Sequence, residues 1–527
     1  MTAAAAAALN VEAVVAELRS TYAAGKTRTF QWRASQLKAL LKIATHHERE
    51  IVEALRSDLN KPEHEAFVHE IASTCKMALK KLSRWMKPRK VKTSILSFPS
   101  SAEIVSEPLG VVLVISTWNY PFLLSLDPVI GAIAAGNAVV LKPSEVAPAT
   151  SLLLAKLLGE YLDTSAVKVV EGAVPETTAL LEQRWDKIFY TGNGKVGRIV
   201  LAAAAKHLTP VVLELGGKCP VVVDANINLK KSVHVKKVAA KRIISGKWGC
   251  NNGQTCVAPD YVITTKEVAP KLVDALKAQL MGFYGKNLVA SRDMSSIINS
   301  HHFDRLAKLM EDEKVSGKIV CGGQHDKTNL KIAPTILLDV PEDSLIMNEE
   351  IFGPLLPIIT VLVIPCNSRC NFHFGSSENN LSVWGMRTSD PPYPAFAGAV
   401  EVNKIEECFR VINVKEKPLA AYVFTNDKNL KDEFTRNVAA GGMTINDTVL
   451  HFVEPGLPFG GVGESGTGAY HGKYSFDSFS HKKAVLKRGF GVEVSARYPP
   501  YTPGKLQFLK ALIQGNVIGV IRAFVGW

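Results

Sequence analysis

The spacing of apolar residues divides the chain into a helical start and a longer region of strands and helices. Between residues 11 and 90, apolar side chains such as Val15, Leu18 and Leu37 recur at a period near 3.6 rather than two, which predicts helices. Beyond residue 110, short apolar runs are separated by helical patterns and lie at residues 111–115, 138–141, 167–170, 187–190 and 211–213. Strands that are apolar on both faces and alternate with helices predict a parallel, doubly wound sheet.

A second series of strand patterns begins near Glu214 and predicts a second α/β domain. Its apolar runs lie at residues 261–264, 333–338, 355–361 and 420–425. The segment 92–107 alternates apolar and polar residues without a helical pattern beside it. We therefore expect an extended arm that pairs with a late strand such as 484–494 and builds a homodimer.

Composition indicates an ordinary globular protein. The 527 residues are 47% hydrophobic and 21% charged, which leaves room for two or three domains. The formal net charge of +13 comes from Lys and Arg spread along the chain, so we expect a solvated basic surface and no nucleic-acid partner. The 8 cysteines form neither a dense disulfide framework nor paired CxxC motifs, which favours a reducing, cytoplasmic location.

Neither end of the chain predicts a membrane-spanning segment. Residues 1–18 are rich in alanine, lack a basic start and contain Glu12 and Glu17, so they indicate an amphipathic helix rather than a secretion signal. The apolar stretch 508–527 is interrupted by polar and charged residues such as Lys510 and Arg522. This tail is expected either to make peripheral contact with an intracellular membrane or to pack on a neighbouring subunit.

Two motifs carry a candidate nucleophile and base. The stretch Asn252-Gly-Gln-Thr-Cys256-Val-Ala-Pro-Asp260 places a cysteine in a loop before a strand pattern. A thiolate in such a loop attacks carbonyl carbons, although a single cysteine is more often a buried apolar residue. Upstream, Leu213-Glu214-Leu215-Gly216-Gly217 places a carboxylate at a strand end. In a partly apolar site this carboxylate acts as a general base near neutral pH, whereas a surface glutamate has no such role.

Three further motifs follow predicted strands. Thr117-Trp118-Asn119-Tyr120-Pro121 follows the run 111–115, and the Asn119 amide is suited to donate to a developing oxyanion. One strand later, Lys142 and Glu145 offer an ammonium and a carboxylate for ribose hydroxyls. Tyr190-Thr-Gly192-Asn-Gly194-Lys-Val-Gly197 joins a strand, a glycine turn and a helix start, which is an anion site suited to a pyrophosphate.

These five motifs, in this order, resemble those of the aldehyde dehydrogenase superfamily. The motifs Glu349-Glu350-Ile351-Phe352-Gly353-Pro354 and Pro458-Phe459-Gly460-Gly461 strengthen the resemblance, which covers roughly residues 10 to 490. The helical start and the ending Gly472-Lys-Tyr-Ser-Phe-Asp-Ser-Phe-Ser-His481 resemble class 3, the fatty and aromatic aldehyde dehydrogenases, in a plant-like form. Thr117 stands where the family more usually has proline.

The resemblance implies a Rossmann-like doubly wound cofactor domain, a second α/β catalytic domain and a β-arm for oligomerisation. The implied division is a dinucleotide-binding domain (1–91 and 108–212), a catalytic domain (213–440), a bridging arm (92–107 and 441–500) and an apolar tail (501–527).

The same resemblance implies NAD(P)-dependent oxidation of a fatty, medium-chain or aromatic aldehyde to the carboxylic acid, without a metal. The Cys256 thiolate attacks the aldehyde, and Asn119 and the Cys256 amide hold the oxyanion. Hydride then passes to the nicotinamide, and Glu214 activates the water that hydrolyses the thioester. His301 and His302, in a polar helical stretch, are interpreted as a solvated pair rather than a competing base.

The implied cofactor contacts extend over several motifs. Lys142 and Glu145 hold the adenosine ribose, and Glu350 and Phe352 position the nicotinamide ribose. Because Glu145 repels a 2′-phosphate, the sequence favours NAD, with NADP left open. The remaining predicted cofactor-binding residues are Gly192, Asn193, Gly194, Lys195, Val196, Gly197 and Leu215.

Two rival interpretations remain open. A coenzyme-A-acylating dehydrogenase transfers the acyl group to a thiol, and Glu214 argues against this because that outcome is favoured when no base activates water. An inactive or structural protein that keeps the fold is the other rival, since a fold does not dictate a function.

The second rival rests on an atypical insertion at about residues 362–400, where the family pattern is interrupted. The insertion has no helical or strand period and contains Cys366, Cys370 and the run Pro391-Pro-Tyr-Pro-Ala-Phe-Ala-Gly398. Our hypothesis is a translated, unspliced intron, because that run is compatible with a pyrimidine-rich tract ending in AG. A metal site from Cys366, Cys370 and His373 is the alternative, with only three candidate ligands.

Overall fold

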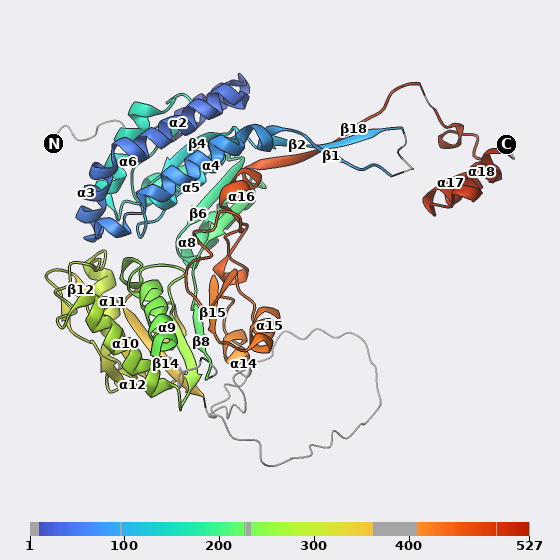
Figure 1. The fold of residues 1–527 in the computed structure, drawn as a ribbon. Coiled ribbons are helices and arrows are strands. Elements are labelled where there is room, and N and C mark those ends of the chain that lie inside the picture. The colour runs from blue at the N-terminus through green and yellow to red at the C-terminus, as the bar shows by residue number, and fades with distance from the viewer. Residues whose placement is uncertain are drawn as a thin grey trace, which may run out of the picture.

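A computed structural model describes residues 10–94, 97, 99–225, 227, 233–361, 408–491 and 493–525. The insertion expected at 362–400 lies outside these residues. The described chain forms two α/β units and a thin β-arm that ends beside a pair of helices (Figure 1). No helix among the described residues is long and apolar enough to cross a membrane.

The first sheet has six strands in the order β17-β7-β6-β3-β4-β5. They are β3 (Val111–Ile115), β4 (Ala138–Lys142), β5 (Val167–Val169), β6 (Lys187–Thr191), β7 (Val211–Glu214) and β17 (Gly466–Thr467). All neighbours pair in parallel except β17, which pairs antiparallel with β7. The chain therefore runs outward from β3 on one side and returns through β6 on the other, which confirms the doubly wound fold.

Alternate residues of β3 pack on opposite faces of this sheet. Val111 and Leu113 belong to the apolar cluster that includes the first helix, whereas Val112 and Val114 belong to the cluster that includes α5 (Leu123–Ala135). Burial on both faces explains the continuous apolar run. The other helices of this unit are α1 (Val11–Ala23), α2 (Phe30–His46), α3 (Glu48–Leu59), α4 (Val68–Met86), α6 (Pro148–Tyr161), α7 (Val174–Leu181) and α8 (Gly194–Ala205).

The second sheet has seven strands in the order β10-β13-β14-β9-β8-β15-β16. They are β8 (Pro220–Val223), β9 (Tyr261–Thr265), β10 (Ile319–Cys321), β13 (Thr335–Leu338), β14 (Leu355–Val361), β15 (Ala420–Phe424) and β16 (Gly442–Ile445). The sequence did not predict β8 or β16. Residues 442–445 were assigned to the arm, and that boundary is wrong for them, because β16 pairs in parallel with β15.

The helices of the second unit include α9 (Val233–Lys247), α10 (Ala269–Tyr284), α11 (Ser300–Glu311), α12 (Glu313–Ser316), α13 (Leu345–Asn348), α14 (Cys408–Asn413) and α15 (Lys428–Asn437). A separate two-stranded hairpin pairs β11 (His325–Asp326) with β12 (Lys331–Ile332).

The arm is an antiparallel sheet of β1 (Arg89–Val91), β2 (Ser101–Pro108) and β18 (Ser480–Lys487). The expected pairing of residues 92–107 with a late strand is confirmed, with Ile104 opposite Ala484, although β18 begins and ends earlier than predicted. Helix α16 (Gly472–Ser478) precedes β18 and packs on α5. Beyond the arm, α17 (Pro503–Ile513) and α18 (Val517–Val525) pack on each other away from both sheets (Figure 1).

Candidate active site

Cys256 lies in an irregular loop between the 3-10 helix η4 (Asn251–Gly253) and β9. Burial raises the pKa of its thiol, and the nearby carboxylates of Glu350 and Glu214 raise it further. Hydrogen bonds from the backbone N–H groups of Cys256 and Val257 oppose this shift. The thiol therefore lies near two carboxyl groups and two backbone N–H donors.

Gln254 connects this loop to Asn119, which follows β3. The Asn119 amide donates from Nδ2 to the Gln254 carbonyl at 3.0 Å, and Asn251 Nδ2 donates to the Asn119 carbonyl at 3.0 Å. The Gln254 side chain is fully buried, donates to the Ser296 carbonyl and accepts the Ile298 N–H at 3.0 Å. Asn119 and the Cys256 loop, which are far apart in sequence, are thus held together as expected.

Glu214 is the last residue of β7 and is 2% exposed. Burial raises its pKa well above the ordinary value. Neither carboxyl oxygen has a hydrogen-bond partner among the described residues. An unpartnered buried carboxyl is costly to fold, and a strongly shifted pKa is typical of groups at functional sites.

Glu350 and Phe352 reach the site from the turn before β14. Burial raises the pKa of Glu350 to about 8, and the charge of Asp260 adds to this shift. The Glu350 carboxyl accepts the Gly217 N–H and lies against Gly216, where an added Cβ would fall 2.4 Å from Oε2. Phe352 adopts a left-handed φ of 49° and contacts Trp118, with ring centres 5.4 Å apart.

A buried ion pair holds this turn in place. Lys218 Nζ donates to Asp260 Oδ2 at 2.5 Å and to the Ile346 and Glu349 carbonyls at 2.9 Å each. Asp260 Oδ1 accepts the Ile351 N–H at 2.9 Å. The backbone on both sides of Glu350 is therefore tied to the strands around Cys256. The sequence motifs contain Lys218 and Asp260, but no sequence signal distinguished them from solvated residues.

Lys142 and Glu145 lie at the end of β4, as predicted. Lys142 Nζ donates to Glu145 Oε2 at 2.6 Å, to the Pro143 carbonyl at 2.7 Å and to the Gly172 carbonyl at 2.8 Å. These contacts use all three donors of the buried ammonium. The Glu145 carboxylate is therefore partly exposed at the end of β4, and the Lys142 ammonium that holds it is buried.

The predicted anion turn lies at the start of α8. Asn193 is the N-cap, and its side chain accepts the Val196 N–H at 3.0 Å, while Gly194 and Lys195 begin the helix. At Gly192 an added Cβ would lie 2.2 Å from the Tyr190 hydroxyl oxygen, so this position excludes larger residues. Gly197 faces Leu215, whose Cδ2 lies 3.2 Å from an added Cβ. A strand, a glycine turn and a helix N-terminus fit a phosphate group.

The interpretation of His301 and His302 as a solvated pair is wrong for one member. His301 is exposed, but His302 stacks on Trp118 with ring centres 5.1 Å apart. Burial lowers the pKa of His302 to about 4. The neutral imidazole therefore forms part of the aromatic wall that also contains Phe352.

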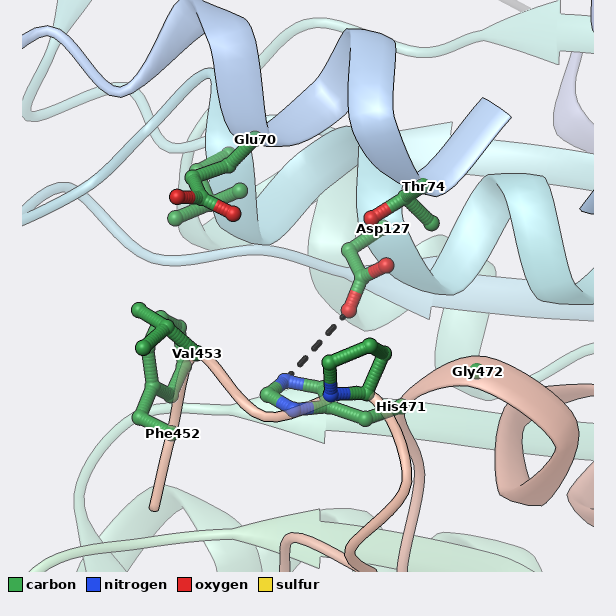
Figure 2. A pocket seen from close by; sticks show the side chains of 9 residues that line it. Glu70, Thr74, Asp127, Phe452, Val453, His471 and Gly472 are labelled. Carbon is green, nitrogen blue, oxygen red and sulfur yellow. Dashed lines mark ion pairs between the residues drawn. The ribbon is translucent and has the colours of Figure 1, made fainter. Parts of the chain in front are cut away.

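A pocket that the sequence did not indicate lies between α4, α5 and the loop before α16. It has a cavity volume of about 40 Å³ and includes Glu70, Asp127, Phe452, Val453 and His471. Figure 2 shows Asp127 pointing toward the His471 ring, with Oδ2 3.5 Å from Nε2. Burial raises the pKa of Asp127 to about 7 and lowers that of His471 to about 3. Finding this pair required the tertiary fold.

The neighbouring Tyr470 connects this pocket to the candidate site. Burial raises the pKa of Tyr470, and the nearby charges of Glu214, Asp127 and Cys256 add to the shift. The pocket therefore lies within electrostatic range of the carboxyl and thiol groups identified above.

Comparisons with known proteins agree with this geometry. A family model described as "Aldehyde dehydrogenase family" matches residues 1–363 and 396–485. A Craterostigma plantagineum protein named aldehyde dehydrogenase is 64% identical over 522 residues, covering 98% of this chain and 99% of that protein. Aldehyde dehydrogenase family 3 member H1 of Arabidopsis thaliana is 58% identical over 516 residues, covering 97% of each chain.

Two more distant proteins extend the comparison. The rat "aldehyde dehydrogenase, dimeric NADP-preferring" is 42% identical over 502 residues, covering 94% of this chain and 99% of that protein. The structure described as the "substrate bound state of Staphylococcus Aureus AldH" has a TM-score of 0.84 and 37% identity, covering 95% of this chain and 99% of that chain. The family match is interrupted within the predicted insertion.

Proposed function

The chain belongs to the aldehyde dehydrogenase family, and we propose that Cys256, Glu214 and Asn119 carry its oxidation of an aldehyde to the carboxylic acid. The observation that supports this assignment best is the Cys256 thiol in a loop tied to Asn119, facing two carboxyl groups of raised pKa. This arrangement combines a nucleophile, a base and a side-chain donor.

In the first half of the reaction, the protonated Cys256 must lose its proton before the sulfur attacks the aldehyde carbon. Of the two carboxylates whose charges reach the thiol, Glu350 has the larger effect, so we assign this proton to Glu350. Asn119 Nδ2 uses one N–H on the Gln254 carbonyl, which leaves its second N–H for the substrate oxyanion. The Cys256 backbone amide is the second donor that we assign to this oxyanion.

In the second half, water hydrolyses the thioester on Cys256. Glu214 has no competing hydrogen-bond partner among the described residues, and its raised pKa suits a general base. Deprotonated Glu214 takes one proton from water as the hydroxyl oxygen forms a bond to the acyl carbon. The sulfur–carbon bond then breaks, and the carboxylic acid leaves.

A nicotinamide dinucleotide, when bound, supplies the two-electron acceptor that this oxidation requires. The first sheet fits such a group, because the turns after β3 and β6 flank the point where the strand order reverses. We assign the pyrophosphate to the Gly192–Gly197 turn and Leu215, and the nicotinamide ribose to Glu350 and Phe352. We assign the adenosine ribose to Glu145, whose carboxylate Lys142 holds in place. The partly exposed Glu145 carboxylate favours NAD over NADP by charge repulsion.

The rivals are weaker on this geometry. Glu214 is placed to activate water, which argues against transfer of the acyl group to coenzyme A. An impaired or structural member would need the chemistry to be damaged by the insertion at 362–400. The proposed site residues all precede this insertion in the sequence and lie within the described residues.

For the chain as a whole, we propose a dinucleotide-binding unit around the first sheet, a catalytic unit around the second, and an arm that holds a homodimer. Two apolar side chains on the arm, Val91 and Leu486, are 40% and 60% exposed, which is consistent with a partner surface. The rat relative is itself named dimeric.

We further propose a cytoplasmic protein whose tail makes peripheral contact with an intracellular membrane. Residues 503–525 contain Lys505, Lys510 and Arg522 but no acidic residue. Several apolar side chains of this tail are exposed, among them Ile513, Val517, Ile518 and Ile521. Basic and apolar groups together favour an anionic lipid surface. The described cysteines form no disulfide bond, which fits a reducing compartment.

Replacing the nucleophile should abolish the reaction and leave the fold intact. We expect Cys256→Ala to eliminate both the first burst and the steady formation of reduced cofactor with a medium-chain aldehyde, without added coenzyme A. Cys321→Ala, which changes a similarly half-buried cysteine on β10, is the control and should keep wild-type rates. Cofactor absorbance measures both phases. Turnover by Cys256→Ala above background would refute the assignment.

Removing the base should separate the two halves of the reaction. We expect Glu214→Gln to give a first burst and then a steady-state rate lower by about 10²- to 10⁴-fold, since only hydrolysis needs this base. Hydroxylamine, which attacks the thioester without a protein base, should partly restore turnover. An equal loss of burst and steady state would show that Glu214 acts before acylation.

The arm proposal predicts a dimer that weakens when its exposed apolar surface becomes charged. Leu486→Asp should raise the monomer fraction at micromolar concentration, whereas Lys487→Asp, next to it on β18, should have a smaller effect. Light scattering measures the mass. A wild-type protein that is monomeric at every concentration contradicts the proposal.

The tail proposal predicts selective binding to anionic vesicles. The full chain should co-sediment with phosphatidylserine-containing vesicles more than with neutral phosphatidylcholine vesicles, and deletion of residues 503–527 should remove this difference without loss of activity. If the full chain stays in the supernatant with both vesicle types, the tail has no membrane role.

A further inference from the structure

Two oppositely charged side chains are buried behind the Cys256 loop and take no part in the chemistry described above. Lys61 and Glu65 are 2% and 4% exposed. They lie in the connection between α3 and α4, with Glu65 at the end of the 3-10 helix η2 (Glu63–Glu65). Charged side chains are rarely buried so completely unless they have a specific partner or role.

Glu65 holds the beginning of the Cys256 loop. Its Oε2 accepts the backbone N–H of Asn251 at 2.8 Å and the Ser295 hydroxyl at 3.2 Å. Asn251 adopts a left-handed φ of 53°, a conformation that L side chains rarely adopt. The Asn251 side chain in turn donates to the Asn119 carbonyl at 3.0 Å. The Glu65 carboxylate is therefore linked to Asn119, the proposed oxyanion donor, through Asn251 alone.

Lys61 acts on the other end of the same loop. Its Nζ lies 3.5 Å from the centre of the Tyr120 ring and has no hydrogen-bond partner among the described residues. The Tyr120 hydroxyl hydrogen-bonds with Thr255 Oγ1 at 3.0 Å, and Thr255 Oγ1 donates to the Cys250 carbonyl at 2.8 Å. The Lys61 ammonium therefore holds the Tyr120 ring next to Asn119, and the Tyr120 hydroxyl contacts Thr255 next to Cys256.

Three other titratable groups face this pair, and all are neutral. Burial raises the pKa of Cys250 to about 12 and raises the pKa values of Tyr120 and Tyr284 above their ordinary range. Burial lowers the pKa of Lys61 to about 7 and raises that of Glu65 to about 7, while the charge of each opposes the shift of the other. Within this cluster, Lys61 and Glu65 therefore each favour the charged form of the other.

We propose that Lys61 and Glu65 are positioning residues, whose opposite charges fix the segment from Asn251 to Cys256 against Asn119 and so set the rate of attack on the aldehyde. The inference rests on the roles proposed above for Cys256 and Asn119. Neither side chain touches substrate. Each acts on Asn119 or Cys256 through the residues that contact or adjoin them. A small displacement of reacting groups costs a large part of the rate.

The test compares the first-turnover burst rate in Glu65→Gln, Lys61→Met and the double variant. Glu63→Gln, an exposed neighbour on the same turn, is the control. We expect each single variant to slow the burst by about ten- to a hundredfold, with the aldehyde KM and the cofactor Kd changed by less than about twofold. The control should keep the wild-type burst.

The double variant separates positioning from stability. Removing both charges leaves no unpaired buried ion, so its melting temperature should return toward the wild-type value. Its burst should stay slow, because the groups that hold the loop are gone. A double variant that melts normally and has a wild-type burst would overturn the proposal, and this comparison decides the question even if the single variants fail to fold.

The pH profile supplies a second measurement. Below about pH 7 Glu65 gains a proton, and above it Lys61 loses one, so the ratio of the wild-type burst rate to that of the double variant should be largest near pH 7 and fall on both sides. A flat ratio refutes positioning by charge.

If wild type and Glu63→Gln show no burst that depends on Cys256, the proposed function itself fails. If both burst normally and Glu65→Gln is equally fast, only this inference fails.

Discussion

The buried amide of Gln254 is the interaction on which the arrangement of the site depends most. The backbone carbonyl of Gln254 accepts a hydrogen bond from the Asn119 side chain, which follows β3 of the first sheet. The Gln254 side chain donates to the Ser296 carbonyl and accepts the Ile298 N–H, both in the second unit. The Cys256 loop has little regular structure, so its polar backbone has few strand or helix partners. A single buried side chain supplies several of these partners and joins the two α/β units at the point where the nucleophile lies.

In this site, some buried polar side chains have all their hydrogen bonds formed and others do not. Lys218, Asp260 and Gln254 have their hydrogen bonds filled and define the backbone. Glu214 has no partner among the described residues, and its burial works against folding. The stability of the surrounding network offsets that cost. Proteins commonly retain such unfavourable features at functional sites, where a group must remain available for a reaction.

The sequence predicted elements best where burial is complete on both faces. The runs at 111–115 and 355–361 coincide with β3 and β14, because every position of β3 and all but one of β14 are buried. It missed β8, a four-residue strand that begins with proline, and β16, which contains a glycine and is only partly buried. Neither strand has enough residues to produce a clear period.

For the site, the motifs predicted that Glu214 and Asn119 lie near one another, because the ends of parallel strands meet at one edge of the sheet. Cys256 precedes β9 in the second sheet, so its place beside them was implied by the family resemblance. Lys61 and Glu65 lie in a polar connection whose pattern resembles any exposed turn, and only their tertiary neighbours reveal their burial. His302 was misjudged for the same reason, since Trp118 is far from it in sequence. The local sequence pattern therefore identifies the reacting groups more easily than it identifies the residues that position them.

The connectivity of the first sheet has a consequence for biosynthesis. Strand β17 pairs with β7, and β18 pairs with β2, where Lys482 and Ser106, 376 residues apart in the sequence, are hydrogen-bonded. The second sheet, from β8 to β16, lies entirely between these partners in the chain. As the polypeptide leaves the ribosome, the N-terminal unit must wait with an incomplete edge while the unit that carries Cys256 is made, and such long-range closures form slowly. The growing chain therefore leaves one edge of β2 unpaired until β18 has been made, which is the period when a chaperone has most to protect.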